Sequence, residues 1–409
     1  MTHERIRLSN TRDSFHARAW DFGASKAVVA ADQVFLVGAT GLTLDNKGFV
    51  GEGDPAAQAE QAMENLRILL EEAGGGLEDI CLVNNYTKRH ADRGLVYPVI
   101  ARHLHHVNPV STGLVVKDFA QPYIDFEIDA WAILPKDRAA GHDRFRLTNA
   151  KGGYLMPTID YPNARVIRAN DHIFLQGQTG MSLDGRDFDG VGDPARQVEV
   201  AMQNVRTLLA DAGASLDDVC KITTYLTNPS HRPQIDAVLA SHLADVRPVV
   251  TSIDVDDLAR PELDFEIDVF VLLPGDEPHR RISMPAAPGA EVMWPQSQVV
   301  RAGRFVFLQG QSGLRLDGSG LTGAGDAEAQ AEQAMQNVKV LLEESGGCMK
   351  DICKITTFVT DQAMRKDVYP VFGKHLDGVN PTSTGLVVEA LWKSELQVAI
   401  DVFAVIGDA

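Results

Sequence analysis

Acidic side chains recur in three strand-like stretches, and acids placed in this way could move protons. In one stretch Asp264, Glu266 and Asp268 alternate with aliphatic and aromatic residues. Successive side chains of a strand point to opposite faces, so these carboxylates share one face and the aliphatic side chains share the other. Two further stretches repeat the pattern, and one acid stands at the same place in all three: Asp129, Asp268 and Asp401. Carboxylic acids are common general acids and bases, which makes these three residues candidates for catalysis.

Two of the three stretches add a second acid two residues earlier. Glu127 precedes Asp129, and Glu266 precedes Asp268, so each pair lies about 7 Å apart on one strand face. Two buried carboxyls at that distance raise one another's pKa, and a neutral carboxyl near pH 7 can donate a proton. The third stretch has Ala399 in place of the second acid. We therefore expect it to contribute a different or inactive pocket.

The stretches belong to a threefold internal repeat. Equivalent residues are offset by 139 and then by 133 positions, as Gln58, Gln197 and Gln330 illustrate. The register holds from the first strand of a repeat to its last, so the difference of six residues falls in a linker within 135–161. We predict three domains, with repeat 1 at residues 1–138, repeat 2 at 139–278 and repeat 3 at 279–409.

Each repeat predicts the same series of elements. In repeat 2, a strand at 173–176 leads through a Gly- and Asp-rich loop to Asp193 and Pro194, a helix cap followed by proline at the first helical position. Apolar residues then recur at helical spacing as far as Gly213. A second strand, a second helix and two more strands follow, with an extra strand expected at 165–168. The fold class is α+β, a mixed sheet with two helices on one face, and the other sheet face remains to be covered.

Composition limits the possible partners. The formal net charge is -18 over 409 residues, and no cluster of Lys and Arg offers a phosphate-binding surface, so we expect no nucleic acid and no membrane partner. The chain lacks an apolar run of about 20 residues, and its polar start is unlike a signal peptide, so we expect a cytoplasmic protein. Cys81, Cys220 and Cys353 occupy one repeated position and are interpreted as buried apolar residues.

The ordered motifs resemble the RidA/YjgF family of reactive-intermediate deaminases, present three times in tandem. The resemblance depends on Phe174-Leu175-Gln176-Gly177-Gln178, on Met202-Gln203-Asn204-Val205 and on Glu266-Ile267-Asp268, with matching runs in repeat 3 and looser ones in repeat 1. Small members of that family are similar to chorismate mutase in fold and assemble as trimers with pockets between subunits. The resemblance therefore implies three chorismate-mutase-like domains that form a pseudo-trimer within one chain, with three boundary pockets.

The family's site residues can be carried over to this sequence. Its acid falls on Asp129, Asp268 and Asp401, and Glu127 and Glu266 are added as helpers. Its pocket glycine falls on Gly38, Gly177 and Gly310. The aromatic residues have an alternative interpretation as plain core residues. They map to Phe22, Tyr161 and Trp294 for the pocket wall, and to Tyr86, Tyr225 and Phe358 for the second aromatic position.

One family residue is missing. Deaminases of the family have an arginine two residues after the proline that opens a strand, where it grips the substrate carboxylate. This chain has Ser111, Val250 and Ser383 there. The repeated arginines Arg93, Arg232 and Arg365, ahead of the second helix, could supply the cation, although a solvated or helix-packing role is the alternative.

The resemblance implies a hydrolytic deaminase of an enamine or imine that needs no cofactor. We expect an unsaturated amino-dicarboxylate substrate, such as 2-aminomuconate or a chlorinated analogue from the degradation of aromatic compounds. The alternatives are a metabolite-binding protein without turnover and another hydrolase on the same scaffold. We expect no metal site, because no local or repeated set combines His with two carboxylates at ligand spacing. Further association of the chain into a homo-oligomer stays open.

Overall fold

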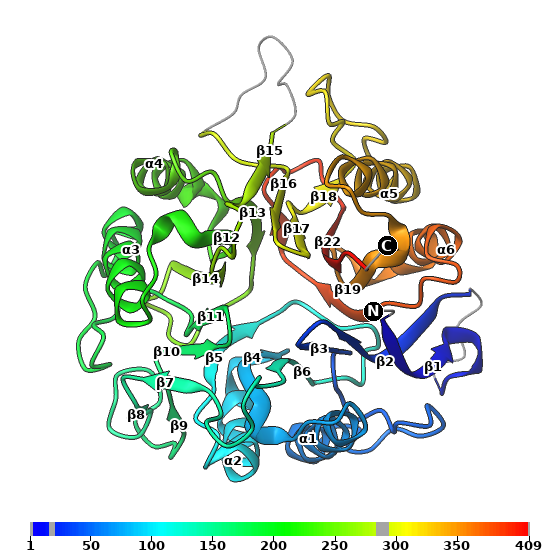
Figure 1. The fold of residues 1–409 in the computed structure, drawn as a ribbon. Coiled ribbons are helices and arrows are strands. Elements are labelled where there is room, and N and C mark those ends of the chain that lie inside the picture. The colour runs from blue at the N-terminus through cyan, green and yellow to red at the C-terminus, as the bar shows by residue number, and fades with distance from the viewer. Residues whose placement is uncertain (1–2, 16–20, 284–293, 408–409) are drawn as a thin grey trace.

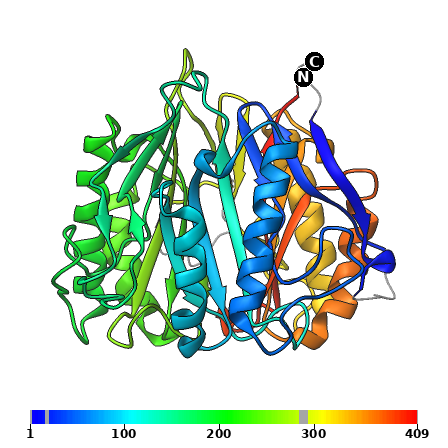
Figure 2. The same ribbon diagram turned by 90° about the horizontal axis from the view of Figure 1, so that it is seen from below.

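The computed structural model describes residues 3–15, 21–283 and 294–407. Three sheets surround a common axis, and their helices lie on the outside (Figure 1). In the view turned by 90°, the helices and strands run along the molecule (Figure 2). The first and last described segments lie together, because the ring of His3 is hydrogen-bonded to the backbone oxygen of Val405 over 2.7 Å. The α+β fold class with mixed sheets is confirmed.

The first sheet has six strands. Their order across the sheet is β1 (Glu4–Asn10), β2 (Gly23–Ala30), β3 (Gln33–Leu36), β6 (Phe126–Ile133), β4 (Ile80–Thr87) and β5 (Val110–Val115). Strands β4 and β5 run parallel, and the other pairs are antiparallel. Helices α1 (Pro55–Glu72) and α2 (Arg93–Leu104) cover its outer face.

The second sheet repeats this order with one addition. It runs β7 (Asp143–Phe145), β10 (Val166–Ala169), β11 (His172–Leu175), β14 (Phe265–Leu272), β12 (Val219–Leu226), β13 (Val249–Asp254) and β21 (Ala390–Leu391). The extra strand expected at 165–168 is therefore β10. Strand β21 comes from repeat 3, so the sheet continues across a repeat boundary. Helices α3 (Pro194–Asp211) and α4 (Arg232–Leu243) cover it, and a small hairpin of β8 (Thr148–Asn149) and β9 (Pro162–Asn163) lies in the linker before it.

The third sheet has the same plan. Its order is β15 (Arg280–Ile282), β16 (Val299–Ala302), β17 (Phe305–Leu308), β22 (Val398–Val405), β19 (Ile352–Val359) and β20 (Thr382–Val387), with β18 (Gln311–Ser312) also paired to β22. Helices α5 (Ala327–Glu344) and α6 (Arg365–His375) lie outside. Strands β7 and β15 begin soon after residues 138 and 278, where we place the domain boundaries, and those boundaries stay predictions.

The repeated Asp, Gln and Asn residues have local structural roles. Asp193 accepts a hydrogen bond from the backbone N–H of Arg196 and caps α3, as predicted. Gln197 is fully buried, and its amide joins the helix to the strand connection by donating to Glu262 and accepting from the N–H of Asp264. Asn204 donates to the backbone oxygen of Met181. These contacts fix the Gly-rich loop against the helix in each repeat.

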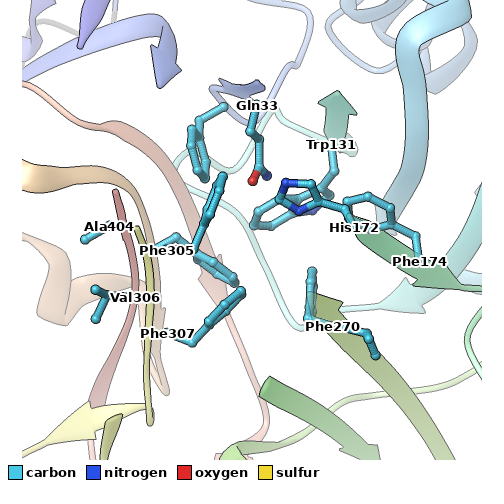
Figure 3. A pocket seen from close by; sticks show the side chains of 12 residues that line it. Gln33, Trp131, His172, Phe174, Phe270, Phe305, Val306, Phe307 and Ala404 are labelled. Atoms are coloured by element: carbon cyan, nitrogen blue, oxygen red, sulfur yellow. The ribbon is translucent and has the colours of Figure 1, made fainter. Parts of the chain in front are cut away.

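The inner faces of the three sheets form one apolar core around the axis. Trp131, Phe270 and Phe403 meet there, with ring centroids 4.6 to 5.6 Å apart. Cys81, Cys220 and Cys353 belong to the same core, and burial raises the pKa of each thiol to about 12. Their interpretation as buried apolar residues is confirmed. Figure 3 shows the end of this core, where a cavity of 10 Å³ is lined mainly by aromatic rings and by Gln33 and His172. That volume is about the size of a single water molecule, too small for a metabolite.

Buried charges join the repeats beside the axis. Lys221 of repeat 2 lies 3.0 Å from Asp401 of repeat 3, and Lys354 of repeat 3 lies 3.0 Å from Asp129 of repeat 1. Both lysines are only 1% exposed. At the remaining boundary the equivalent position is Leu82, and Asn84 donates to Asp268 instead, over 3.2 Å.

We predict that Lys221→Met destabilises the protein by about 3–5 kcal/mol, because Asp401 then keeps a buried charge without its cation. The double variant Lys221→Met/Asp401→Asn should recover much of that loss, since no lone charge remains. Urea unfolding followed by circular dichroism measures both. Lys339→Met, on the exposed side of α5, is the control. Equal destabilisation by Lys221→Met and by Lys339→Met would contradict the prediction.

Candidate functional site

Besides the axial cavity, two pockets formed by described residues lie between repeats, and each receives residues from two domains. The 1/2 pocket has a volume of 50 Å³ and the 3/1 pocket a volume of 170 Å³. Repeat 1 contributes Arg93, Tyr97 and Ser111 to the 1/2 pocket, and repeat 2 contributes Tyr161, Gly177 and Glu266. The equivalent residues line the 3/1 pocket: Arg365, Tyr369 and Ser383 from repeat 3, and Phe22, Gly38 and Glu127 from repeat 1.

The acids that line the pockets are the glutamates. Glu127 and Glu266 are about 5% exposed. A Cβ atom on Gly38 or Gly177 would collide with the carboxylate of Glu127 or Glu266, so glycine is needed for this close approach. Burial, followed by the charge of Asp129, raises the pKa of Glu127 to about 8, although Arg365 and Lys354 oppose the shift. Burial and Asp268 raise the pKa of Glu266 to about 8 in the same way.

The aspartates lie beside the glutamates, bonded to the neighbouring repeat. Asp129 accepts a hydrogen bond of 2.5 Å from Thr384, and Asp401 accepts one of 2.5 Å from Thr251. Asp268 accepts from Thr112 and also from Tyr225, over 2.5 and 2.7 Å. Burial raises the pKa of Asp268 to about 6 against these hydrogen bonds. The predicted effect of one paired acid on the other is therefore found for the two glutamates, whereas the pKa of Asp268 is raised by burial and not by Glu266.

An arginine faces the glutamate in both pockets. Arg93 and Arg365 begin α2 and α6 and are each 6% exposed. Arg365 lies 4.2 Å from the centroid of the Tyr369 ring, and among the described residues its Nε and Nη1 atoms find no hydrogen-bond partner. Arg93 lies 5.0 Å from the centroid of the Tyr97 ring and donates to its hydroxyl over 3.3 Å.

Glycine again provides the space. A Cβ atom on Gly113 would collide with the hydroxyl of Tyr97 and crowd Arg93, and Gly385 stands in the same relation to Tyr369 and Arg365. Ser111 and Ser383, at the position of the missing family arginine, line the same pockets. The arginine cation thus reaches each pocket from the helix rather than from the strand.

The boundary between repeats 2 and 3 is built differently. Arg232 forms an ion pair of 2.5 Å with Asp254 and donates to Ser252, which occupies the position of Gly113 and Gly385. Asp236 stands where the other two sites have tyrosine, and Ala399 stands where they have glutamate. Arg232 is therefore neutralised by Asp254 of its own repeat, and this boundary lacks the glutamate that lines the other two pockets.

The predicted aromatic residues fall into two groups. Phe22 and Tyr161 are pocket-wall residues, and their rings lie edge to face with Tyr369 and Tyr97 at centroid distances of 5.6 and 5.8 Å. Trp294 is buried in the core of repeat 2. Gly310 lies near Thr251 and Asp401 at the boundary between repeats 2 and 3. The second set, Tyr86, Tyr225 and Phe358, is buried together in one apolar cluster at the repeat boundaries.

Sequence reasoning missed four pocket residues. Tyr97 and Tyr369 recur four residues after the arginines, one helical turn further on, which was a usable signal. Lys26 and Arg165 also line the pockets at one repeated position. The sequence did not indicate them, because the third repeat has Gln298 at that position and a basic residue therefore does not recur in all three repeats.

Within residues 3–15, 21–283 and 294–407, no group of three or more His, Cys, Asp or Glu residues could hold a metal ion. None of the helices there is both long and apolar enough to cross a membrane.

Comparison with known proteins supplies the context for this geometry. A family model described as Endoribonuclease L-PSP matches residues 22–134, 156–273 and 284–406. Protein DfrA of Myxococcus xanthus is 35% identical over 120 residues, which cover 29% of this chain and 89% of the relative. A 2-iminobutanoate/2-iminopropanoate deaminase of Dermatophagoides farinae is 37% identical over 82 residues, 20% of this chain and 62% of the relative. The resemblance seen in the sequence is confirmed.

One solved structure is similar over most of the chain. A chorismatase matches with a TM-score of 0.52 at 13% identity, covering 80% of this chain and 93% of its own. At that identity the likeness concerns the fold alone.

We predict that two glutamate side chains titrate near pH 8. In Asp129→Asn only the pKa of Glu127 should fall, because one of the charges that raises it is gone. Carboxyl NMR of glutamate-labelled protein measures both titrations. Asp401→Asn is the matched control, since Ala399 leaves it no glutamate to affect, and a shift of both resonances in Asp129→Asn would contradict the assignment.

Proposed function

Because the chain belongs to the Endoribonuclease L-PSP family, in three consecutive copies, we propose that it is a hydrolytic deaminase of an enamine or imine. The observation that carries the proposal is the arrangement of the 1/2 and 3/1 pockets. Each places a carboxyl with a pKa of about 8 opposite a buried arginine. The name of the Dermatophagoides relative, an imine deaminase, agrees with this chemistry.

The arginine holds a carboxylate of the substrate. A guanidinium donates two parallel hydrogen bonds to a carboxylate, and the exclusion of water around Arg93 or Arg365 strengthens them. A substrate fixed in this way brings its C–N carbon to the glutamate with little loss of orientation in the reaction step. Ser111 and Ser383 add a hydroxyl to the same wall.

The glutamate moves the proton. In its neutral form, Glu127 or Glu266 protonates the carbon of an enamine and leaves an iminium ion and a carboxylate. The carboxylate then accepts a proton from a water molecule as the water oxygen bonds to the iminium carbon. The glutamate, which now holds the proton from water, protonates the nitrogen of the resulting amino alcohol. As the C–N bond breaks, the hydroxyl proton returns to the glutamate carboxylate, so ammonia is released, the keto group forms and the neutral acid is restored. Asp129 and Asp268 keep the glutamate pKa high enough for the first step.

The finer proposal is the substrate. An unsaturated amino-dicarboxylate such as 2-aminomuconate, or a chlorinated analogue, is an enamine that tautomerises to an imine and has a carboxylate next to the reacting carbon. That carboxylate suits the arginine of each pocket. Endoribonuclease action is disfavoured, because a chain with a net charge of -18 is a poor partner for RNA.

In this proposal, the pockets at two of the three repeat boundaries are catalytic. The 2/3 boundary lacks the glutamate, and its arginine is bound to Asp254. Asp401 therefore has an interface role in this proposal, whereas Asp129 and Asp268 act on the neighbouring glutamates.

We expect Glu127→Gln and Glu266→Gln each to remove the contribution of one pocket, and the double variant to lower kcat by about 10²- to 10⁴-fold, the usual contribution of a general acid. Ammonia release and the loss of dienamine absorbance measure turnover of 2-aminomuconate. The double variant Lys221→Met/Asp401→Asn, which leaves no lone charge at the 2/3 boundary, should leave turnover unchanged. No turnover by the unmodified protein would sink the deaminase proposal, and ligand binding without turnover would favour the metabolite-binding alternative.

The pH profile tests the role of the glutamates separately. A group with a raised pKa keeps its proton below that pKa and loses it above, so kcat/KM, which reports the free enzyme, should fall as the pH rises past about 8. The residual activity of the double Gln variant should lack this fall. A profile that rises through pH 8 would show that the carboxylate, rather than the neutral acid, is the form needed first.

A further inference from the structure

A second cation stands in each of the two pockets at one repeated position. Lys26 on β2 lines the 3/1 pocket with Arg365. Arg165, directly before β10, lines the 1/2 pocket with Arg93. Each pocket therefore contains two buried positive groups and one raised-pKa carboxyl.

Lys26 is buried without an anion. It is 8% exposed, and within the described residues no carboxylate forms an ion pair with it. Burial, with a small addition from Arg7, lowers its pKa to about 8. A lysine in this state costs stability unless something negative enters beside it.

Arg165 is held in place by its own repeat. Its Nε donates to the backbone oxygen of Leu183 over 3.1 Å, and its Nη1 donates to the side chain of Gln176. Burial lowers the pKa of Arg165 to about 10, and Asp184 opposes the shift. The guanidinium is thus positioned at the pocket wall by neutral acceptors, and it is 5% exposed.

At the third boundary neither position offers a cation to a ligand. Gln298 occupies the second position, where its side-chain oxygen accepts from Gln311 over 3.4 Å, and the first cation, Arg232, is bound to Asp254. The two boundaries that have the glutamate also have both cations on the pocket wall. The boundary that lacks the glutamate has one cation paired with Asp254 and the other replaced by Gln298. This co-occurrence indicates that Lys26 and Arg165 serve ligand binding rather than the packing of the repeat.

We propose that Lys26 and Arg165 form a second anion subsite, so that each pocket receives a small ligand with two acidic groups, one on the helix arginine and the other on this cation. The inference rests on the proposed function and deepens it by naming the residues that select a dicarboxylate over a monocarboxylate.

Two unreactive probes with the same six-carbon diene test the subsite. Muconate has a carboxylate at both ends and sorbate at one, so their difference in affinity reports the second subsite alone. By calorimetry the unmodified protein should bind two muconate molecules per chain and prefer muconate to sorbate by about tenfold to a hundredfold. Lys26→Met should remove that preference at one site, Arg165→Met at the other, and the double variant at both.

Controls separate the subsite from a structural role. Gln298→Met, at the same position of the third boundary, should change neither probe. Lys26→Met should unfold at the same or a higher urea concentration than the unmodified protein, because a lone buried charge is gone, whereas a structural lysine would lower it.

The outcomes also distinguish the two proposals. Equal binding of muconate and sorbate by the unmodified protein, or a preference that survives in the double variant, would overturn the subsite. Tighter binding of inorganic phosphate than of muconate would also overturn it, since one anion would then bridge both cations. Turnover without a dicarboxylate preference leaves the deaminase intact, and a dicarboxylate preference without turnover leaves the subsite intact.

Discussion

Buried carboxylates on the inner sheet faces are the constraint from which the rest of the structure follows. Asp129, Asp268 and Asp401 are each at most 4% exposed, and an isolated carboxylate cannot remain ionised there at acceptable cost. Each is compensated by a threonine hydroxyl from the neighbouring repeat. A single repeat cannot supply those partners, so the acidic strands require the three domains to close around the axis.

The same closure creates the pockets. Closing the sheets brings the start of α2 to Glu266 and the start of α6 to Glu127, although these partners are more than 170 residues apart in the chain. The low dielectric of such a boundary raises the pKa of a carboxyl and strengthens its attraction to a guanidinium at the same time. The raised pKa of the glutamate and its strengthened attraction to the arginine thus result from burial between domains, and an isolated repeat would show neither.

Three copies in one chain allow the boundaries to diverge. In a trimer of identical chains, replacing glutamate by alanine would change all three pockets at once. Here the changes gather at one boundary, where Asp254 neutralises Arg232 and Ala399 takes the place of the acid. The Lys221–Asp401 pair still joins that boundary, so it keeps the contacts that hold the repeats together while it lacks the groups that line the other two pockets.

Local patterns predicted much of this protein. The fixed offset of repeated residues, the alternation along the acidic strands and the Asp caps of the helices are short-range features, and they led to the three α+β repeats, the acids on one face and the raised pKa of the paired carboxyls. The arginines at 93, 232 and 365 were recognised as possible cations on their repeated position alone.

Only the tertiary structure decided which of these residues meet. Sequence periodicity is the same for Arg93, Arg232 and Arg365, yet Arg232 is bound to Asp254 and the other two line pockets, because their surroundings come from distant segments. Lys26 and Arg165 were not identified, because the third repeat has Gln298 at their position and because their place on a pocket wall depends on segments from a neighbouring repeat. The placement of Glu127 and Glu266 on the pocket walls, with the aspartates bonded across the boundaries, likewise depends on packing between repeats, which no pattern within one repeat contains.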